Sequence, residues 1–337
     1  MVSAMLGSMN HHTSQAPDHL LALIQQVKGH YTEIGGARKK RGKPRTYSSL
    51  SFLLLALVAV TLRTFKEREL HRLLAQDDSL RQELGFAQVP HRRTIERRLQ
   101  SLIPEAEAQI AATGERIVAA VQVADEQPPI SAIDGRMYEA QGPLWHKQHR
   151  ELGLIPRGLR NVDVESSWSK SGYRGWVQGY RLVLQGLVFP EPVPLFATWR
   201  ANSEGEATIM AEALTQQRLP VTSVLLGDET YGGAALGEAY AEQGGWLLTP
   251  KQLPQERRSW KHDLFAYRKQ TIELLFQRII QSCDLKECPV KGRERNGAFV
   301  LASVWLYQCV FLTNYRQGTA AAQVKDQIDK ARWRIAA

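Results

Sequence analysis

The chain has 337 residues, of which 43% are hydrophobic and 23% charged, a usage typical of globular proteins that excludes wholesale disorder. This length predicts roughly two domains. Lys and Arg number 43 against 34 Asp and Glu, and residues 1–100 hold 16 of the basic residues against 8 of the acidic ones. A basic N-terminal third joined to a nearly neutral remainder is typical of a polyanion-binding module attached to a second function.

Cysteine usage and hydropathy argue against a disulfide-stapled secreted protein and against a membrane span. The three cysteines, Cys283, Cys288 and Cys309, form an odd set without framework spacing, and no nearby His or second Cys pair completes a zinc site. No basic start followed by an apolar stretch opens the sequence, and the longest apolar run, Leu50–Leu62, is too short to cross a bilayer. We therefore expect reduced thiols and a cytoplasmic protein that associates with the nucleoid when it acts.

Residues 1–45 predict a mobile basic arm. Six basic residues crowd into residues 38–45, where Gly42 and Pro44 disfavour a continuous helix. Such arms commonly lie along DNA phosphates, although a merely solubilising segment has the same composition. The candidate phosphate contacts are Arg38, Lys39, Lys40, Arg41, Lys43 and Arg45.

Residues 46–123 predict an all-helical region that binds DNA ends. Apolar residues recur there at helical spacing, without strand-like alternation. In HRRTIERRLQSL, Ile95, Leu99 and Leu102 share one stripe, and basic residues occupy other faces. This helix could read the major groove as part of a helix-turn-helix, or its arginines could simply be solvated. The candidate DNA contacts in it are Arg92, Arg93, Arg97 and Arg98.

Beyond an acidic, proline-ended linker at residues 124–129, the pattern becomes α/β. The strand-like segments ISAIDGRMYEA, GYRLVLQGLVF and PLFATWR come first, and helices then alternate with the strands TSVLLGD and WLLTP. A long helix at residues 263–283 and a closing apolar helix follow. We expect a mixed sheet with flanking helices over residues 130–320, and a C-terminal tail over residues 321–337.

Three acidic residues occupy positions where an α/β fold exposes catalytic groups. Asp134 is predicted to close the first strand, Asp228 to emerge at the carboxyl edge of a central strand, and Glu273 to flank the core stripe of the long helix. Asp134 could instead form a hairpin turn with Gly135, and Asp228 could cap a helix. Glu273 could pair with Lys269.

Converging carboxylates without a His or Cys partner point to a hard metal ion. Carboxylate oxygens are the ligands that Mg²⁺ and Mn²⁺ prefer, and two such ions promote phosphodiester cleavage. The gathered negative charge of three carboxylates also needs neutralisation. We therefore expect two Mg²⁺ ions, with Mn²⁺ as the substitute.

These segments resemble a bacterial insertion-sequence transposase of the DDE class, in the broad IS-four/IS-five-type group, over about residues 45–315. AIDGRMY is similar to the segment with the family's first aspartate, and GWVQGYRLVL to its glycine-aromatic strand. LLGDETYGG resembles the second-aspartate segment, and YRKQTIELLFQRI the helix that carries the glutamate. REL, LGF and VPHRRTIERRL are similar to the helical end-binding region.

The resemblance implies a ribonuclease-H-like catalytic domain preceded by a helical DNA-binding region. It assigns the metal ligands to Asp134, Asp228 and Glu273. The large inserted β domain of some relatives does not fit between the second aspartate and the glutamate. The family's helix signature implies further DNA contacts at Tyr267, Lys269 and Arg278, with Lys269 standing where Arg is usual.

The stretch WSKSGYRGWVQGYR interleaves aromatic and basic residues, as surfaces that stack bases and follow a DNA backbone do. Aromatic pairs on adjacent strands are the structural alternative. The candidate DNA contacts there are Trp168, Lys170, Arg174 and Trp176. The pair His146 and His149 is expected to be structural or to lie on the surface, and Asp163 and Glu165 are the substitutes if the three carboxylates are wrongly chosen.

The expected function is transposition of an insertion sequence. The protein would bind double-stranded DNA at terminal inverted repeats, cut it with bound metal and join the freed end to target DNA. A homodimer is expected in the DNA complex, with no membrane and no small-molecule substrate. The alternatives are a non-catalytic DNA-binding protein derived from a decayed transposase, and a metal-dependent nuclease without strand transfer.

Overall fold

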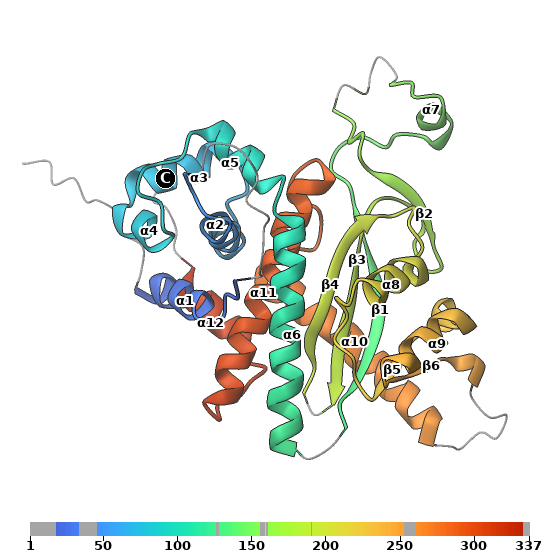
Figure 1. The fold of residues 1–337 in the computed structure, drawn as a ribbon. Helices are drawn as coiled ribbons and strands as arrows, with labels where there is room; N and C mark the ends of the chain where they lie inside the picture. The colour runs from blue at the N-terminus through green and yellow to red at the C-terminus, as the bar shows by residue number, and fades with distance from the viewer. Residues whose placement is uncertain are drawn as a thin grey trace, which may run out of the picture.

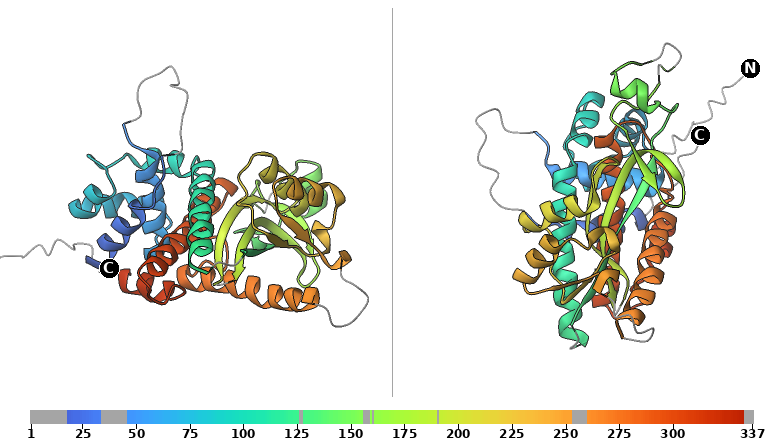
Figure 2. Two further views of the ribbon diagram at one scale, coloured as in Figure 1. Left: turned by 60° about the horizontal axis from the view of Figure 1, so that its bottom comes forward. Right: turned by 90° about the vertical axis from the view of Figure 1, so that its right-hand side faces the viewer.

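The computed structural model describes residues 18–33, 46–125, 128–155, 159, 161–189, 191–252 and 260–332. A helical part and an α/β part lie on either side of two long helices, α6 (Ile103–Asp125) and α11 (Arg293–Arg316), as Figure 1 and the left view of Figure 2 show. Both helices pack on strand β4 (Val193–Ala201), and α11 also packs on α2 (Ser49–Leu62). The two parts therefore share one core.

Helices are the regular secondary structure described over residues 46–123, as the apolar periodicity predicted. Helix α2 is followed by α3 (Glu67–Gln76), α4 (Asp78–Glu83) and α5 (Arg92–Leu99). The Ser48 hydroxyl caps α2 by accepting the Ser51 N–H, and Arg63 ends it at a φ of 56°. The apolar run that fills α2 is buried, because α1, α5, α11 and α12 surround it.

Two predicted tails contain helices that belong to the core. Helix α1 (Asp18–Lys28) lies inside the predicted arm, and α12 (Val324–Ala331) lies inside the predicted C-terminal tail. Each buries an apolar stripe, and the two pack against one another. The boundaries predicted for the arm and the tail are wrong to that extent. The basic residues predicted for the arm, in residues 38–45, lie outside the described residues.

One mixed sheet forms the centre of the α/β part. Strand β3 (Gly175–Phe189) pairs antiparallel with β1 (Ile130–Glu139) on one edge, and with β2 (Ser167–Ser171) and β4 on the other. Strand β5 (Val224–Leu226) pairs parallel with β1, and β6 (Trp246–Leu248) pairs parallel with β5. The mixed α/β architecture predicted from the sequence is confirmed.

Helices cover both faces of this sheet. Helices α8 (Glu206–Thr215) and α9 (Ala234–Glu242) pack with one core cluster, which takes Ile133, Val183 and Leu225. The alternate strand residues, such as Ala132 and Leu226, face the larger cluster with α10 (Trp260–Cys283) and α11. The remaining short elements are α7 (Lys147–Glu151), η1 (Glu229–Tyr231) and η2 (Pro250–Gln252).

Within the described residues, α11 is long and apolar enough to cross a membrane, but 94% of its most apolar window is buried inside the fold. Helices α2 and α3 reach that length only together, and they are bent by 100° at their junction. Both cases fit core helices. Cys283, Cys288 and Cys309 are buried free thiols, and burial raises their pKa values.

Candidate active site

The sheet places Asp134 and Asp228 side by side. Ala132 of β1 lies opposite Leu226 of β5 in the last parallel pair, and each aspartate comes two residues later along its strand direction. Because β1 and β5 run parallel, the two carboxylates leave the same edge of the sheet. Neighbouring strands lie about 4.8 Å apart, so the two residues are close. The sequence predicted this edge for Asp228, and the prediction is confirmed.

Asp134 does not close its strand as predicted. Strand β1 continues to Glu139, because β3 goes on pairing with it, and Asp134 lies opposite Leu184. The hairpin turn at Asp134–Gly135 is therefore wrong as well. Gly135 meets a different need: a Cβ there would lie 2.4 Å from Oε1 of Glu206, so a larger residue would displace that carboxylate.

Asp228 has two roles in the structure. Its Oδ1 accepts the Thr230 N–H at 2.8 Å and so caps η1, as the capping alternative predicted. The same side chain lines the cleft at the sheet edge. A carboxylate oxygen has more than one lone pair, so capping leaves acceptor capacity toward the cleft.

Helix α10 is fastened over the two aspartates by Arg268. Its Nη2 donates to the Ile133 carbonyl at 2.7 Å and its Nε to the Leu226 carbonyl at 3.4 Å, so it holds the middle of β1 and the end of β5. The same Nη2 lies 3.9 Å from Oδ1 of Asp134. Glu273, farther along α10, is exposed toward the cleft. Among the described residues, no ion pair joins Glu273 to Lys269.

A cleft of about 600 Å³ gathers these groups. Acidic side chains from β1, α8, the β5 end and α10 share it with basic side chains from β1, β2, β3 and the turn between them. Its charged lining residues are Asp134, Glu206, Asp228, Glu273, Arg136, Lys170, Arg174 and Arg181. The three predicted carboxylates thus face one space, beside cations that could neutralise a phosphate backbone.

The charge on Asp134 is not fully compensated. Burial raises the pKa of its carboxyl to about 6, with further increases from Glu206 and Asp228. The Arg268 guanidinium and the Gly135 N–H lower the pKa, but they do not offset the burial. A carboxyl with a raised pKa in a cleft, beside other acids, is typical of a functional site.

The donor set fits a divalent ion chemically, since carboxylate oxygens suit Mg²⁺ and Mn²⁺. In the part of the chain that the structure describes, no group of three His, Cys, Asp or Glu side chains is arranged to hold a metal ion as it stands. Glu273 is exposed on its helix and lines the same cleft as the two aspartates.

The hairpin between β2 and β3 forms one wall of the cleft. Lys170 and Arg174 line it, and Arg174 also pairs with Glu139. Trp176 is 60% exposed, with Nζ of Lys147 at 5.8 Å from its ring centre. The exposed side chains of Lys170, Arg174 and Trp176 remain available for DNA.

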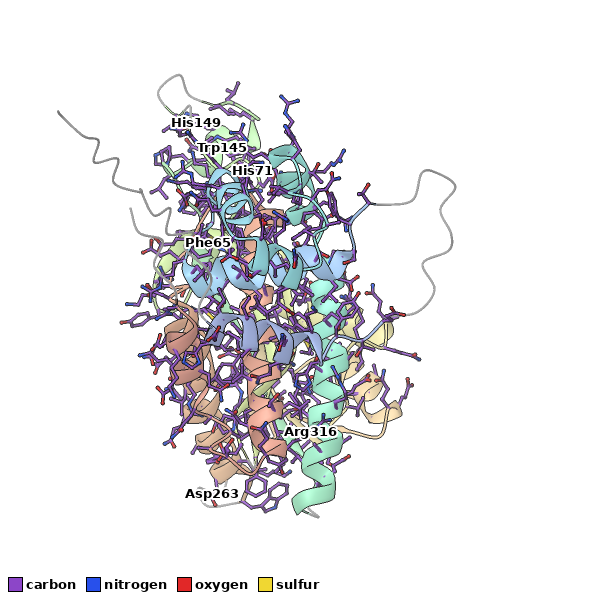
Figure 3. The ribbon with its side chains drawn as sticks, turned by 90° about the vertical axis from the view of Figure 1, so that its left-hand side faces the viewer. Phe65, His71, Trp145, His149, Asp263 and Arg316 are labelled. Atoms are coloured by element: carbon purple, nitrogen blue, oxygen red, sulfur yellow. The ribbon has the colours of Figure 1, made fainter. Side chains whose placement is uncertain are left out.

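Trp168 has a structural role instead, because its Nε1 donates to the Trp145 carbonyl at 2.6 Å. In the side-chain view, Trp145 and His149 lie together at one end of the molecule, and Asp263 of α10 lies at the opposite end (Figure 3). The rings of His146 and His149 lie edge to face, 6.3 Å between centroids, and both side chains are exposed.

The predicted DNA contacts on helices divide in the same way. Arg92, Arg93 and Arg97 of α5 are exposed. Arg98 is committed internally, because its guanidinium lies 5.0 Å from the centre of the Phe52 ring and its Nη2 donates to the Ser49 hydroxyl.

On α10, Tyr267 and Lys269 are exposed, which leaves both free to contact DNA. Arg278 is partly buried beside the buried Tyr307. Arg98 and Arg278 therefore support the fold rather than present a free cation.

Asp163 and Glu165, the predicted substitutes, anchor α11. The buried Asp163 accepts the Tyr180 hydroxyl at 2.8 Å and the Gly292 N–H at 2.9 Å, and Glu165 accepts the Arg293 N–H. They lie outside the carboxylate cleft and line a second one of about 430 Å³. Their hydrogen bonds explain their presence without catalysis.

The sequence did not point to Glu206, which lines the cleft, or to Arg268, which lies beside Asp134. Glu206 opens a predicted helix, where an acidic residue is ordinary. Arg268 stands between the predicted DNA contacts Tyr267 and Lys269, and its burial depends on where α10 docks. The only signal for either was proximity to a predicted motif.

No protein-family model and no curated protein matches the sequence. Among solved structures, the piggyBac transposase in a synaptic complex with hairpin DNA is 10% identical, with a TM-score of 0.44 over 93% of this chain and 78% of that chain. The Mos1 transposase in a paired-end complex with the left transposon end is 12% identical, with a TM-score of 0.21, and covers 85% of this chain and 84% of its own. The Mos1 strand transfer complex is 13% identical, with a TM-score of 0.22. These TM-scores are too low to establish a shared fold.

Proposed function

We propose that the protein is a DDE-type DNA transposase of an insertion sequence, in the IS-four/IS-five-type group that the sequence resembles. The observation that carries the proposal is that Asp134, Asp228 and Glu273, from two neighbouring strands and a long helix, line one cleft. The antiparallel β4–β3–β1 order, continued by parallel β5 and β6, supports a ribonuclease-H-like catalytic domain.

Asp134, Asp228 and Glu273 would hold the divalent ions, Mg²⁺ or Mn²⁺. Bound ions supply charge neutralisation at the phosphodiester and lower the pKa of an attacking water. The protein's own part is positioning. Arg268 fixes α10 against β1 and β5, and the hydrogen bond from Thr230 N–H orients Asp228.

The reaction has two displacements at phosphorus. In the first, a water oxygen attacks the phosphodiester and the bond to the 3′ oxygen breaks, which leaves a 3′-hydroxyl and a 5′-phosphate. In the second, that 3′-hydroxyl attacks a target phosphodiester, and a new strand joint forms as the old bond breaks. Lys170 and Arg174 on the cleft wall would contact the phosphates on either side of the reacting one.

DNA ends would be gripped by the helical part, with phosphate contacts from residues 38–45 and base contacts from α5. The exposed Arg92, Arg93 and Arg97 are the residues of α5 that can reach DNA. Two DNA ends must meet during transposition, so we propose a homodimer in the DNA complex and a cytoplasmic, nucleoid-associated protein.

The test is Mg²⁺-dependent nicking of labelled DNA taken from the sequence flanking the gene. Wild type should nick it with Mg²⁺ and not with a chelator, and Asp228→Ala should lose nicking while keeping DNA affinity. The control is Asp326→Ala, which removes an exposed carboxylate on α12, away from the cleft. Binding without cleavage by wild type would favour the non-catalytic alternative.

A second assay separates transposase from nuclease. A pre-cleaved end with a free 3′-hydroxyl is supplied together with a target plasmid. Joined product supports strand transfer, and nicking without any joined product would favour the nuclease.

A further inference from the structure

Glu206 connects three elements around the two aspartates. It opens α8, and only 13% of its side chain is exposed. Its Oε1 pairs with Nη1 of Arg181 on β3 at 2.9 Å, and its Oε2 accepts the Tyr231 hydroxyl at 2.7 Å. The same carboxylate lies against Gly135, the residue after Asp134.

The hydrogen bond between Tyr231 and Glu206 matters because the backbone pairing of β1 with β5 ends before the two aspartates. Strands β1 and β5 pair only through Val224–Leu226 of β5. Beyond that point Asp228 sits in a turn, which the backbone ties toward β6 by the bond from Gly227 N–H to the Leu248 carbonyl. Neither the β1–β5 pairing nor the bond from Gly227 to Leu248 fixes the turn that holds Asp228 against β1.

Tyr231 supplies the missing connection. It is fully buried, its N–H bonds to the Asp228 carbonyl at 3.2 Å, and its side chain packs against Gly227, where a Cβ would lie 2.8 Å from Tyr231 Cβ. Tyr231 therefore moves with Asp228, and its hydroxyl donates to the Glu206 carboxylate, which belongs to α8 and packs against Gly135 of β1.

Arg181 holds that carboxylate in place through their ion pair. Its own position is set by the Glu204 carbonyl at 3.4 Å and the Ser169 hydroxyl at 3.3 Å, both outside the catalytic set. The side chains of Arg181 and Glu206 are 8% and 13% exposed, so the pair is largely shielded from solvent. Glu206 is thus a fixed acceptor rather than a free acid.

We propose that Glu206, through Tyr231, is a positioning residue that sets the separation of Asp228 from Asp134. This inference rests on the proposed function, since the separation matters only if the two aspartates act together. Misplacing a reacting group by about 1 Å can cost on the order of 100-fold in rate.

The experiment compares the full-length variants Tyr231→Phe and Glu206→Gln with matched controls. Tyr240→Phe is the control for the phenol, because Tyr240 is buried in the same core cluster and accepts the Thr222 N–H at 2.9 Å, away from the cleft. Glu212→Gln is the control for the carboxylate, on the exposed side of the same helix.

Two readouts are used. In cleavage assays, Tyr231→Phe and Glu206→Gln should lower kcat about 10- to 100-fold, with KM for DNA within about threefold of wild type. In hydrogen exchange without DNA or metal, amides of residues 227–232 should exchange faster in these two variants than in wild type. Both controls should match wild type in kcat and in that segment.

The inference is overturned if Tyr231→Phe lowers kcat no more than Tyr240→Phe, since the hydroxyl would then be merely structural. Should wild type cleave no DNA at all, the proposed function fails. The exchange measurement then still decides the inference, because unchanged exchange over residues 227–232 in both variants would overturn it alone.

Discussion

Replacing Arg268 with methionine tests the clamp that holds α10 over β1 and β5. Methionine keeps much of the buried aliphatic stem and removes the guanidinium. The Ile133 and Leu226 carbonyls then lose donors that now lie at 2.7 and 3.4 Å. Hydrogen bonds from a charged donor contribute about 1.5–3 kcal/mol each, and the longer one counts least. The contact with Asp134, at 3.9 Å, adds about 0.5 kcal/mol because that carboxylate is partly exposed.

The free energy of unfolding should therefore fall by about 2–4 kcal/mol, measured by urea titration with tryptophan fluorescence and circular dichroism. The pKa of Asp134 should also rise further, because the guanidinium now lowers it. Lys269→Met, at the exposed neighbouring position, is the control and should change stability by less than about 0.5 kcal/mol. A loss for Arg268→Met no larger than that of the control would refute the clamp.

Three further outcomes are expected. Glu107→Ala should lower the free energy of unfolding by about 3–5 kcal/mol in urea, since the buried Glu107 pairs with two arginines, and an unchanged midpoint would contradict this. The pKa of Asp134 is raised from 3.8 to about 6, so its stabilising contribution is present below about pH 4 and is lost as the pH rises through 6. Without divalent ions, the free energy of unfolding of Asp134→Asn should fall by about 2 kcal/mol less than that of wild type over this pH range. An equal pH dependence of the two proteins would contradict the raised pKa of Asp134. Arg93→Ala and Arg97→Ala should each reduce the salt dependence of DNA binding by about one unit of slope, and an unaltered slope would remove α5 from the DNA interface.

Local patterns in the sequence were enough to predict the main elements. The unbroken run of VLLGD predicted a central strand and put Asp228 at its carboxyl edge, which depends only on local hydropathy. The position of Asp134 was predicted less well, because β1 extends past it only while β3 remains a partner. How far β1 extends past Asp134 depends on its pairing with β3 and cannot be read from the sequence of β1 alone.

The helices α1 and α12 were missed for a related reason. Each is short, and each buries its apolar stripe against the other, almost 300 residues away in sequence. Glu206 and Arg268 were missed because ordinary helix residues acquire their roles from partners on other elements. The cleft itself follows from three segments that the sequence did identify.

The most direct test of the account is anomalous diffraction at the manganese edge from crystals of the full chain with Mn²⁺ and a cut DNA end. The account predicts manganese peaks with ligand oxygens at about 2.1 Å from Asp134, Asp228 and Glu273. Peaks bound elsewhere, or an ordered DNA end with no manganese at these carboxylates, would contradict it.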